Sequence, residues 1–533
     1  MTTHEAISSP GLPRPEVDAS LHDDQHLLGG IAPAVSRACA MTDTGGFCDQ
    51  AAKPEKWMAA VTHADMLPEA RRRLTAMGVP FDAIKLYTEG GDILGGKFGP
   101  ESVRQRLVLE DLAKQERKNR TLARLDSRHV AFSILQQTGS ACVAAHAMRT
   151  AAVPPSTFSG YDEDLMSVAA EITGLARSPM VDAMLTARLR DGGAGIRLAT
   201  PFADAAFCAS MLETSALQQR ICPALPPAHE DAAFRAAWSR LTNDYSNLTG
   251  ILPSLVQGAA SRLVKVQKRL SEPIAAARLA VLEGLVSADE EARARLRSAA
   301  GNSTWLVPRP SPGDRPEEVG WQNNRDFLFA MAVRTSGAVQ EAEHVCRLCR
   351  TAVADIHGKH TLSCMGSGCR TRWHTQKKNE LFRLASRGMM APRLEPGVGD
   401  AGRRADLAVY LPAHSGDAST LLLDLAITSP FVTPAVTRLA GESIGGAAAA
   451  YAERKLATYR SLTLPAGHKV IPIVCDTLGA YDQRSRAVIS AMIRRVADVE
   501  GEGWARAGPR LWGRLQAAHI AAMGALLSYN FSL

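Results

Sequence analysis

The sequence has little of what marks a secreted, membrane-spanning or disordered protein. Its 533 residues include 10 cysteines, too few for a disulfide scaffold, which favours reduced thiols inside a cell. No run approaches the ~18 apolar residues of a membrane helix, and residues 1–15 lack the basic and then apolar order of a secretory signal. Hydrophobic residues at 46% and charged residues at 22% are ordinary for a globular protein. At ~100–200 residues per domain, this length predicts three or four folded units.

Lysine is also scarce, with 13 lysines against 48 arginines. The net charge is +7 and the isoelectric point is about 8.9. Because the forked guanidinium group suits phosphate oxygens, this balance favours a nucleic-acid partner. A coding bias toward alanine and arginine would give the same excess, so composition alone does not decide.

The pattern changes several times along the first 343 residues. Residues 1–20 are rich in proline, serine and aspartate and predict a flexible lead-in. Residues 21–99 alternate short apolar runs with glycine turns, which predicts mixed α/β structure. Residues 100–300 show apolar side chains three and four apart with charges between them, as in amphipathic helices. Residues 301–343 predict a linker rich in proline and glycine at 301–320, followed by a short helix.

The C-terminal part reads as an α/β unit over residues 376–500, followed by a C-terminal helix within 501–533. Apolar runs and an alanine-rich amphipathic stretch predict its elements. These are strands at 404–411, 420–428 and 469–475 and a helix at 445–462.

A cysteine and histidine cluster lies within residues 344–375. Cys346 and Cys349 are three apart, which brings two thiolates onto one tight turn, and His360 and Cys364 are four apart, on one face of a helical turn. Together these four residues would close a tetrahedral Zn²⁺ site with no open position, which indicates a structural role. Cys369 and a nearby histidine could replace one ligand. The alternative is incidental cysteines near a surface histidine.

A pair of acids marks a second candidate site. Asp406 and Asp424 each lie in a predicted strand of aliphatic residues. Burying an unpaired carboxylate there would cost roughly several kcal/mol of folding free energy. Acids on neighbouring strands can share Mg²⁺ or Mn²⁺, which stabilises charge on a phosphodiester and activates water. Lys455 and Tyr459, four apart on the predicted helix, could meet the phosphate, and Glu395 could add a carboxylate. The alternative is a pair of strand caps or solvated edge acids, with a surface lysine and a packing tyrosine.

With these motifs, residues 345–490 resemble the C-terminal part of a non-LTR retrotransposon polyprotein that carries a restriction-like endonuclease after its reverse transcriptase. The matching strings are CRLCRTAVADIHGKHTLSC, RTRWHTQKKNELF, RRADLAVYLP, DLAITSP, ERKLATYRSL and VIPIVCDTLG. The resemblance implies that Asp406 and Asp424 are the metal-binding catalytic acids, that Lys455 stabilises charge and that Tyr459 is its neighbour. It also implies a structural zinc ion on the cysteine and histidine cluster.

The resemblance extends to the residues expected to contact nucleic acid. These are Arg372 and His374, in the family's short basic-histidine element, together with Lys377, Lys378 and Arg404. Two positions differ from the family's pattern. Position 426 is alanine where restriction-type nucleases carry lysine, so the helix lysine must serve, and position 375 is threonine where asparagine is frequent.

The N-terminal half is similar to the reverse-transcriptase part of the same polyprotein. Leu21, His22, Asp23 and Asp24 are similar to the polymerase palm turn, and the helical region that includes Asp191 resembles the thumb and connector. A palm needs a further metal-binding aspartate from an earlier strand, and only twenty residues precede this turn. We therefore expect a truncated product or a fragment without polymerase activity. A solvated acidic loop is the alternative for the palm turn.

The predicted fold class is α+β multidomain. Its parts are a partial reverse-transcriptase palm (21–99), a helical thumb and connector (100–300), a CCHC zinc knuckle (344–375) and a restriction-endonuclease-like α/β core (376–500). The predicted function is metal-dependent nicking of a DNA target in the nucleus, with element RNA and a separate reverse transcriptase as possible further partners and no membrane partner. A catalytically inactive nucleic-acid-binding remnant is one alternative. A helical interaction protein with solvated arginine-rich faces is another.

Overall fold

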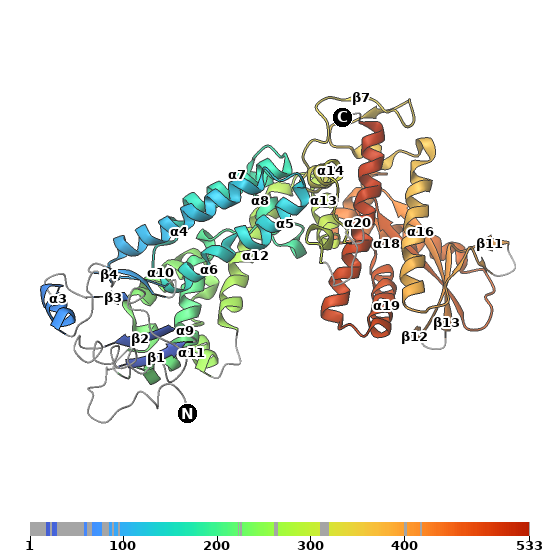
Figure 1. The fold of residues 1–533 in the computed structure, drawn as a ribbon. Helices are drawn as coiled ribbons and strands as arrows, with labels where there is room; N and C mark the ends of the chain where they lie inside the picture. Colours follow the sequence, from blue (N-terminus) through green and yellow to red (C-terminus); the bar gives the residue numbers. More distant parts are fainter. Residues whose placement is uncertain are drawn as a thin grey trace. The chain divides into compact units, whose positions relative to one another are not determined.

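The fold is known from a computed structural model of the chain. It describes residues 17–21, 24–28, 58–60, 67–76, 85–87, 90–93, 96–221, 223, 226–260, 265–309, 319–398, 402–415 and 418–531. Long helices and small sheets make up an α+β protein, as the sequence predicts at this coarse level (Figure 1). The chain forms two compact units. Unit 1 comprises Met1–Lys114, Val143–Gly160 and Ala199–Ile274, and unit 2 comprises Gln115–Cys142, Tyr161–Leu198 and Ala275–Leu533.

Unit 1 begins with short strands. β1 (Val17–Leu21) pairs antiparallel with β2 (Asp24–Leu28), so residues 17–20 form a strand where the sequence predicts a flexible segment. Asp24 opens β2, whereas His22 and Asp23 of the predicted palm turn lie outside the described residues.

The helical part of unit 1 contains α9 (Ala203–Ile221), α10 (Ala232–Asp244) and α11 (Leu252–Ala260). Phe234, Leu255 and Leu270 are fully buried in its core. The Asp231 carboxylate caps α10 by accepting hydrogen bonds from the Ala233 and Phe234 amides at 2.9 and 3.0 Å, which satisfies donors that the first helical turn leaves open.

Unit 2 has a large helical core. α5 (Arg128–Ile134), α7 (Ser159–Thr173), α13 (Glu290–Gly301), α14 (Asn324–Arg334) and α20 (Trp504–Asn530) contribute to it. Trp305, in the 3₁₀ helix η11 (Thr304–Leu306), is 1% exposed and contacts Phe327. The predicted linker at 301–320 is therefore wrong at this point. Proline and glycine signal irregular backbone, but a buried indole anchors this segment in the core.

The candidate site lies on a mixed sheet in unit 2, with strand order β14-β13-β12-β9. Its strands are β9 (Arg393–Leu394), β12 (Leu407–Ser415), β13 (Ala418–Thr428) and β14 (His468–Asp476). β9, β12 and β13 are antiparallel, and β14 runs parallel to β13. The crossover from β13 to β14 contains α17 (Pro434–Glu442) and α18 (Gly446–Tyr459). The predicted strands and helix are confirmed, although β12 begins at Leu407 and the preceding arginines form β11 (Arg403–Arg404), which pairs with β10 (Gly397–Val398).

Helices cover both faces of this sheet. Leu421, Leu423 and Leu425 of β13 pack against α16 (Cys369–Arg387) and α19 (Gln483–Glu500). Leu422 and Ala426 alternate with them and pack on the side of α18. Because side chains alternate along a strand, Asp424 projects toward α18.

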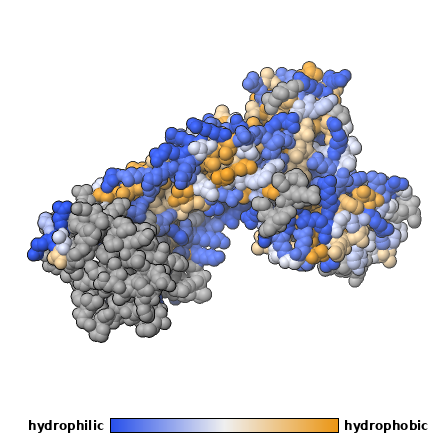
Figure 2. Space-filling model, viewed as in Figure 1, coloured by the Kyte–Doolittle hydropathy of each residue, from blue (hydrophilic) through white to orange (hydrophobic). Residues whose placement is uncertain are grey.

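The predicted C-terminal helix is confirmed as α20, which lies beside α16 (Figure 1). Figure 2 shows apolar residues in small groups between hydrophilic ones on the coloured surface. Among the helices in the described part of the chain, none has the length and hydropathy to cross a bilayer.

Candidate active site and metal centre

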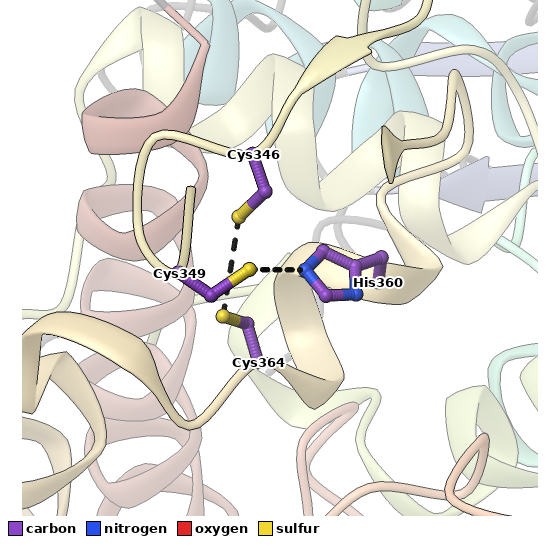
Figure 3. A group of neighbouring side chains, drawn as sticks. All are labelled: Cys346, Cys349, His360 and Cys364. Atoms are coloured by element: carbon purple, nitrogen blue, oxygen red, sulfur yellow. Dashed lines mark hydrogen bonds between the residues drawn. The ribbon is translucent and has the colours of Figure 1, made fainter. Parts of the chain in front are cut away.

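Three cysteines and a histidine converge in unit 2. Cys346 and Cys349 come from the turn between β7 (His344–Val345) and β8 (Val353–Ala354), and His360 and Cys364 come from α15 (Lys359–Ser363) and its end. Figure 3 shows the four side chains pointing toward one another. Their ligand atoms all lie within 4.8 Å of one another, with 3.9 Å between the Cys346 and Cys364 sulfurs and 3.4 Å between Cys349 Sγ and His360 Nε2. The cluster could hold one metal ion.

Local hydrogen bonds orient this cluster. The Asp355 carboxylate accepts a hydrogen bond from the His360 amide at 2.7 Å and so caps α15. Asn530, near the end of α20, accepts from the Arg347 amide at 2.8 Å and donates to Thr361 Oγ1 at 2.5 Å. One side chain of α20 therefore fastens both halves of the cluster.

The thiols differ in acidity. Hydrogen bonds from the Thr351 hydroxyl and from nearby amides lower the pKa of Cys349 to about 5, and His360 acts in the same direction. Burial, together with the adjacent Cys346, raises the pKa of Cys364 to about 11. A cation at the centre would offset the repulsion between these sulfurs once they are deprotonated.

Cys369 and His374, the suggested substitute ligands, do not belong to this cluster. Cys369 Sγ accepts a hydrogen bond from Arg372 at 2.9 Å, and His374 lies at the acid pair. That part of the prediction is corrected, because the ligand atoms that converge are those of Cys346, Cys349, His360 and Cys364, whereas the His374 ring contacts Asp406.

At the acid pair, Asp424 is held by two residues of α18. Lys455 Nζ donates to both Asp424 carboxylate oxygens at 2.8 Å, and the Tyr459 hydroxyl donates to Oδ2 at 2.5 Å. The i, i+4 spacing places both donors on one helix face. Ala448 and Ala452 pack against the sheet with little side-chain volume, so α18 approaches closely enough for these bonds. The Asp424 side chain is 11% exposed.

Asp406 lies just before β12 and hydrogen-bonds to β13, the strand that carries Asp424. Its amide donates to the Leu423 carbonyl at 3.0 Å, and its Oδ2 accepts from the Leu425 amide at 2.7 Å. His374 Nε2 lies 3.3 Å from that oxygen. Burial alone would raise the pKa of Asp406, but His374, the Leu425 amide and the Lys455 charge together lower it. Asp406 in turn raises the pKa of His374.

The Leu425 peptide joins these groups, because its carbonyl lies 3.4 Å from Lys455 Nζ and 3.3 Å from His374 Nε2. Oδ1 of Asp406 has no hydrogen-bond partner among the residues that the structure describes. The pair thus offers carboxylate oxygens, the donors that Mg²⁺ and Mn²⁺ prefer.

Glu395, next to the acid pair, contacts two positively charged side chains. Its carboxylate binds Lys378 at 2.9 Å and lies 3.8 Å from Arg404, and these charges lower its pKa. Its amide donates to the Asp406 carbonyl at 3.1 Å. Lys378 and Arg404 therefore lie beside the acid pair.

Lys377 corrects that prediction at one position. Its side chain is 4% exposed, donates to the Tyr481 hydroxyl at 2.7 Å and lies over the Tyr481 ring. Burial lowers its pKa. A core lysine offers no charge to a phosphate, so we leave Lys377 out of the candidate nucleic-acid surface.

Arg372 lies on the outer face of α16. A shallow cleft of about 490 Å³ runs along this face. Its lining residues are Thr371, Arg372, Thr375, Gln376, Asn379, Glu380 and Arg383.

Sequence reasoning missed Arg403 and the peptide of Leu425. Arg403 Nη1 lies 3.5 Å from the Thr458 carbonyl. Burial and the hydrogen bond to Asp424 raise the pKa of Tyr459, and the Arg403 charge acts in the opposite direction. The arginine pair directly before the acid strand was an available signal for Arg403, whereas a backbone amide leaves no signal in a sequence.

No protein-family model matches the chain, and no match is found among curated proteins. What defines the protein is therefore its own structure. It is an α+β chain with a Cys₃His cluster able to hold a metal ion and a separate group of two acids, a lysine and a tyrosine on a mixed sheet.

Proposed function

We propose that this protein is a metal-dependent endonuclease that nicks DNA at the group formed by Asp406, Asp424, Lys455 and Tyr459. One observation carries the proposal. Two largely buried carboxylates meet a lysine and a tyrosine around the single peptide of Leu425. The resemblance of residues 345–490 to restriction-like endonucleases of retrotransposons supports the same roles.

A purely structural ion pair would need only one acid and one base. Here a second carboxylate, Asp406, lies within electrostatic reach of Lys455 and keeps Oδ1 without a partner among the described residues. Removing several charged side chains from water costs folding free energy. Such an arrangement is typical of a site whose charges act on a ligand.

Asp406 and Asp424 would hold Mg²⁺ or Mn²⁺, because their carboxylate oxygens suit hard cations. Such an ion, when bound, stabilises charge on a phosphodiester and makes water more acidic. Lys455 supplies a fixed positive charge beside the acids, oriented by both oxygens of Asp424. Tyr459, whose pKa is raised, stays protonated at neutral pH and holds Asp424 by donating its hydroxyl proton.

We propose Zn²⁺ as the ion of the Cys₃His cluster. With Zn–S bonds of ~2.3 Å and a Zn–N bond of ~2.0 Å, tetrahedral geometry separates two sulfurs by ~3.8 Å and a sulfur from a nitrogen by ~3.5 Å. The observed separations of 3.9 Å and 3.4 Å are close to both values. Four protein ligands leave no open position, so the ion would be structural.

The proposed substrate is DNA in the nucleus, with element RNA and a separate reverse transcriptase as further proposed partners. Arg403 lies beside Tyr459, and Lys378 and Arg404 lie beside Glu395. These cations border the acids and suit the phosphates that flank a cleaved bond.

Nicking of supercoiled plasmid and branched DNA tests the proposal, with wild type, Asp424→Asn and Glu453→Gln as a matched control. Glu453 lies on α18 but pairs with Arg484 at the surface. We expect nicking with Mg²⁺ or Mn²⁺ that Asp424→Asn lowers by about a hundredfold or more and that Glu453→Gln leaves unchanged. Nicking that survives in Asp424→Asn would refute the site. Wild type that binds zinc and DNA but never nicks would favour the inactive nucleic-acid-binding remnant.

A further inference from the structure

We infer that His374 is a positioning residue, which fixes the spacing between the two acids instead of contacting nucleic acid. The inference rests on the proposed function, since it concerns the same acid pair. It reassigns a residue that the sequence places in a basic element.

The contacts of one ring nitrogen carry the inference. His374 Nε2 lies 3.3 Å from Asp406 Oδ2 and 3.3 Å from the Leu425 carbonyl oxygen. A carbonyl oxygen only accepts hydrogen bonds, so Nε2 must carry the proton and donate. This assignment follows from the hydrogen-bond partners. A nitrogen that donates to fixed acceptors is not available as a general base.

One acceptor belongs to the first acid, and the other lies directly after the second acid in the chain. Asp406 Oδ2 is part of the first carboxylate, and Leu425 directly follows Asp424 in β13. The Leu425 amide also donates to Asp406 Oδ2 at 2.7 Å. One imidazole and one peptide thus link the side chain of the first acid to the backbone beside the second, which sets how far apart they lie.

Helix α16 holds the imidazole in place. Trp373 and Lys377, on either side of His374 on the helix, are 2% and 4% exposed, so this face of α16 is fixed in the core. Arg370, one turn earlier, donates to the Ile427 carbonyl at 3.2 Å, and Lys378, one turn later, binds Glu395. Three successive turns therefore attach α16 to β13 and to the segment that follows β9.

Two polar substitutions separate positioning from simple loss of a side chain. Glutamine carries an N–H donor about as far from its backbone as histidine Nε2, whereas the asparagine donor falls short of both acceptors. We expect His374→Asn and His374→Leu to leave the spacing between the two acids unfixed, whereas His374→Gln should keep the wild-type spacing. His468→Leu, at the start of β14, serves as the matched control because, among the residues described, the His468 imidazole hydrogen-bonds only to the nearby Ala466 carbonyl.

Three readouts are compared on the full chain with zinc bound. They are the Mg²⁺ concentration for half-maximal nicking, the Mn²⁺ dissociation constant by electron paramagnetic resonance without DNA, and the DNA dissociation constant without added Mg²⁺ or Mn²⁺. Loss of a residue that orients a metal ligand raises metal requirements by about 10–100-fold. We expect the Mg²⁺ requirement and the Mn²⁺ dissociation constant to rise by that factor in His374→Asn and His374→Leu and to stay near the wild-type values in His374→Gln. The DNA dissociation constant should stay within about twofold of wild type in all three variants.

Unchanged Mn²⁺ affinity in His374→Asn would overturn the inference, as would a loss confined to DNA affinity, which a nucleic-acid contact predicts. Equal loss in His374→Gln and His374→Asn would also overturn it. Should wild type fail to nick, the proposed function falls, but weaker Mn²⁺ binding in His374→Asn would still support positioning. If zinc-loaded wild type binds no Mn²⁺, both the proposed function and this inference are overturned. His374→Asn decides if His374→Leu does not fold.

Discussion

The buried imidazole of His129 makes the folding of unit 2 sensitive to pH. His129 is fully buried, and the rings of Trp305, Trp321 and Phe327 lie with centroids 5.1–5.5 Å away. Burial lowers its pKa to about 4, although the Leu306 and Trp305 carbonyls act in the opposite direction. The unfolded chain takes up this proton near a pKa of ~6.5. The contribution of neutral His129 to the free energy of unfolding is therefore fully present above pH ~6.5, and it is lost as the pH falls toward 4.

The size of the effect follows from the two pKa values. Between pH 7 and pH 5, protonation of the unfolded chain lowers the free energy of unfolding by ~2 kcal/mol through His129 alone. Urea unfolding of unit 2, followed by tryptophan fluorescence at pH 7, 6 and 5, measures it. His129→Asn keeps an acceptor at about the Nδ1 position for the Gln322 amide, which donates to His129 Nδ1 at 3.0 Å, but cannot titrate. We expect this variant to lose ~2 kcal/mol less than wild type over the same range.

The comparison between variants isolates one group, because every other titrating residue is common to both proteins. If wild type and His129→Asn lose the same free energy between pH 7 and pH 5, the imidazole is not the cause. The burial of the segment around Trp305 would then be in doubt as well.

Two further predictions concern the metal cluster and the acid pair. Cys364→Ser should lower bound zinc, measured by mass spectrometry, from one ion per chain to well below one, and should lower the melting temperature of unit 2; retained zinc would contradict the ligand set. Lys455→Met should reduce nicking by about a hundredfold while DNA affinity stays within about twofold, because Lys455 donates to Asp424. Arg454→Met, a control on the adjacent α18 position, should keep most of the nicking, and equal loss in both variants would contradict the role of Lys455.

The local parts of the candidate site could be predicted from the sequence. Cys346 and Cys349 share a tight turn because three-residue spacing allows nothing longer, and His360 and Cys364 share a helical turn for the same reason. Lys455 and Tyr459 share a helix face, since four residues make about one turn. Each of these relations depends on backbone geometry over a few residues, which the sequence pattern carries.

Contacts between distant elements could not be predicted in this way. His374 and Lys377 are three residues apart on one basic stretch, yet His374 reaches Asp406 and Lys377 is buried against Tyr481. Which face of α16 turns inward depends on its packing against the sheet and α20. The sequence shows only that the residues are polar.

Sequence patterns thus predicted the α+β class, the strands and helices of the sheet, and the four residues able to hold a metal ion. The tertiary structure alone decided that the Leu425 peptide joins the acids, that Trp305 belongs to the core, and that Asn530 fastens the cysteine cluster. The physical reason is the range of the interactions. Periodicity and turn geometry act over a few residues, whereas burial and hydrogen bonding join residues as far apart as Arg347 and Asn530, and only the packed chain brings these together.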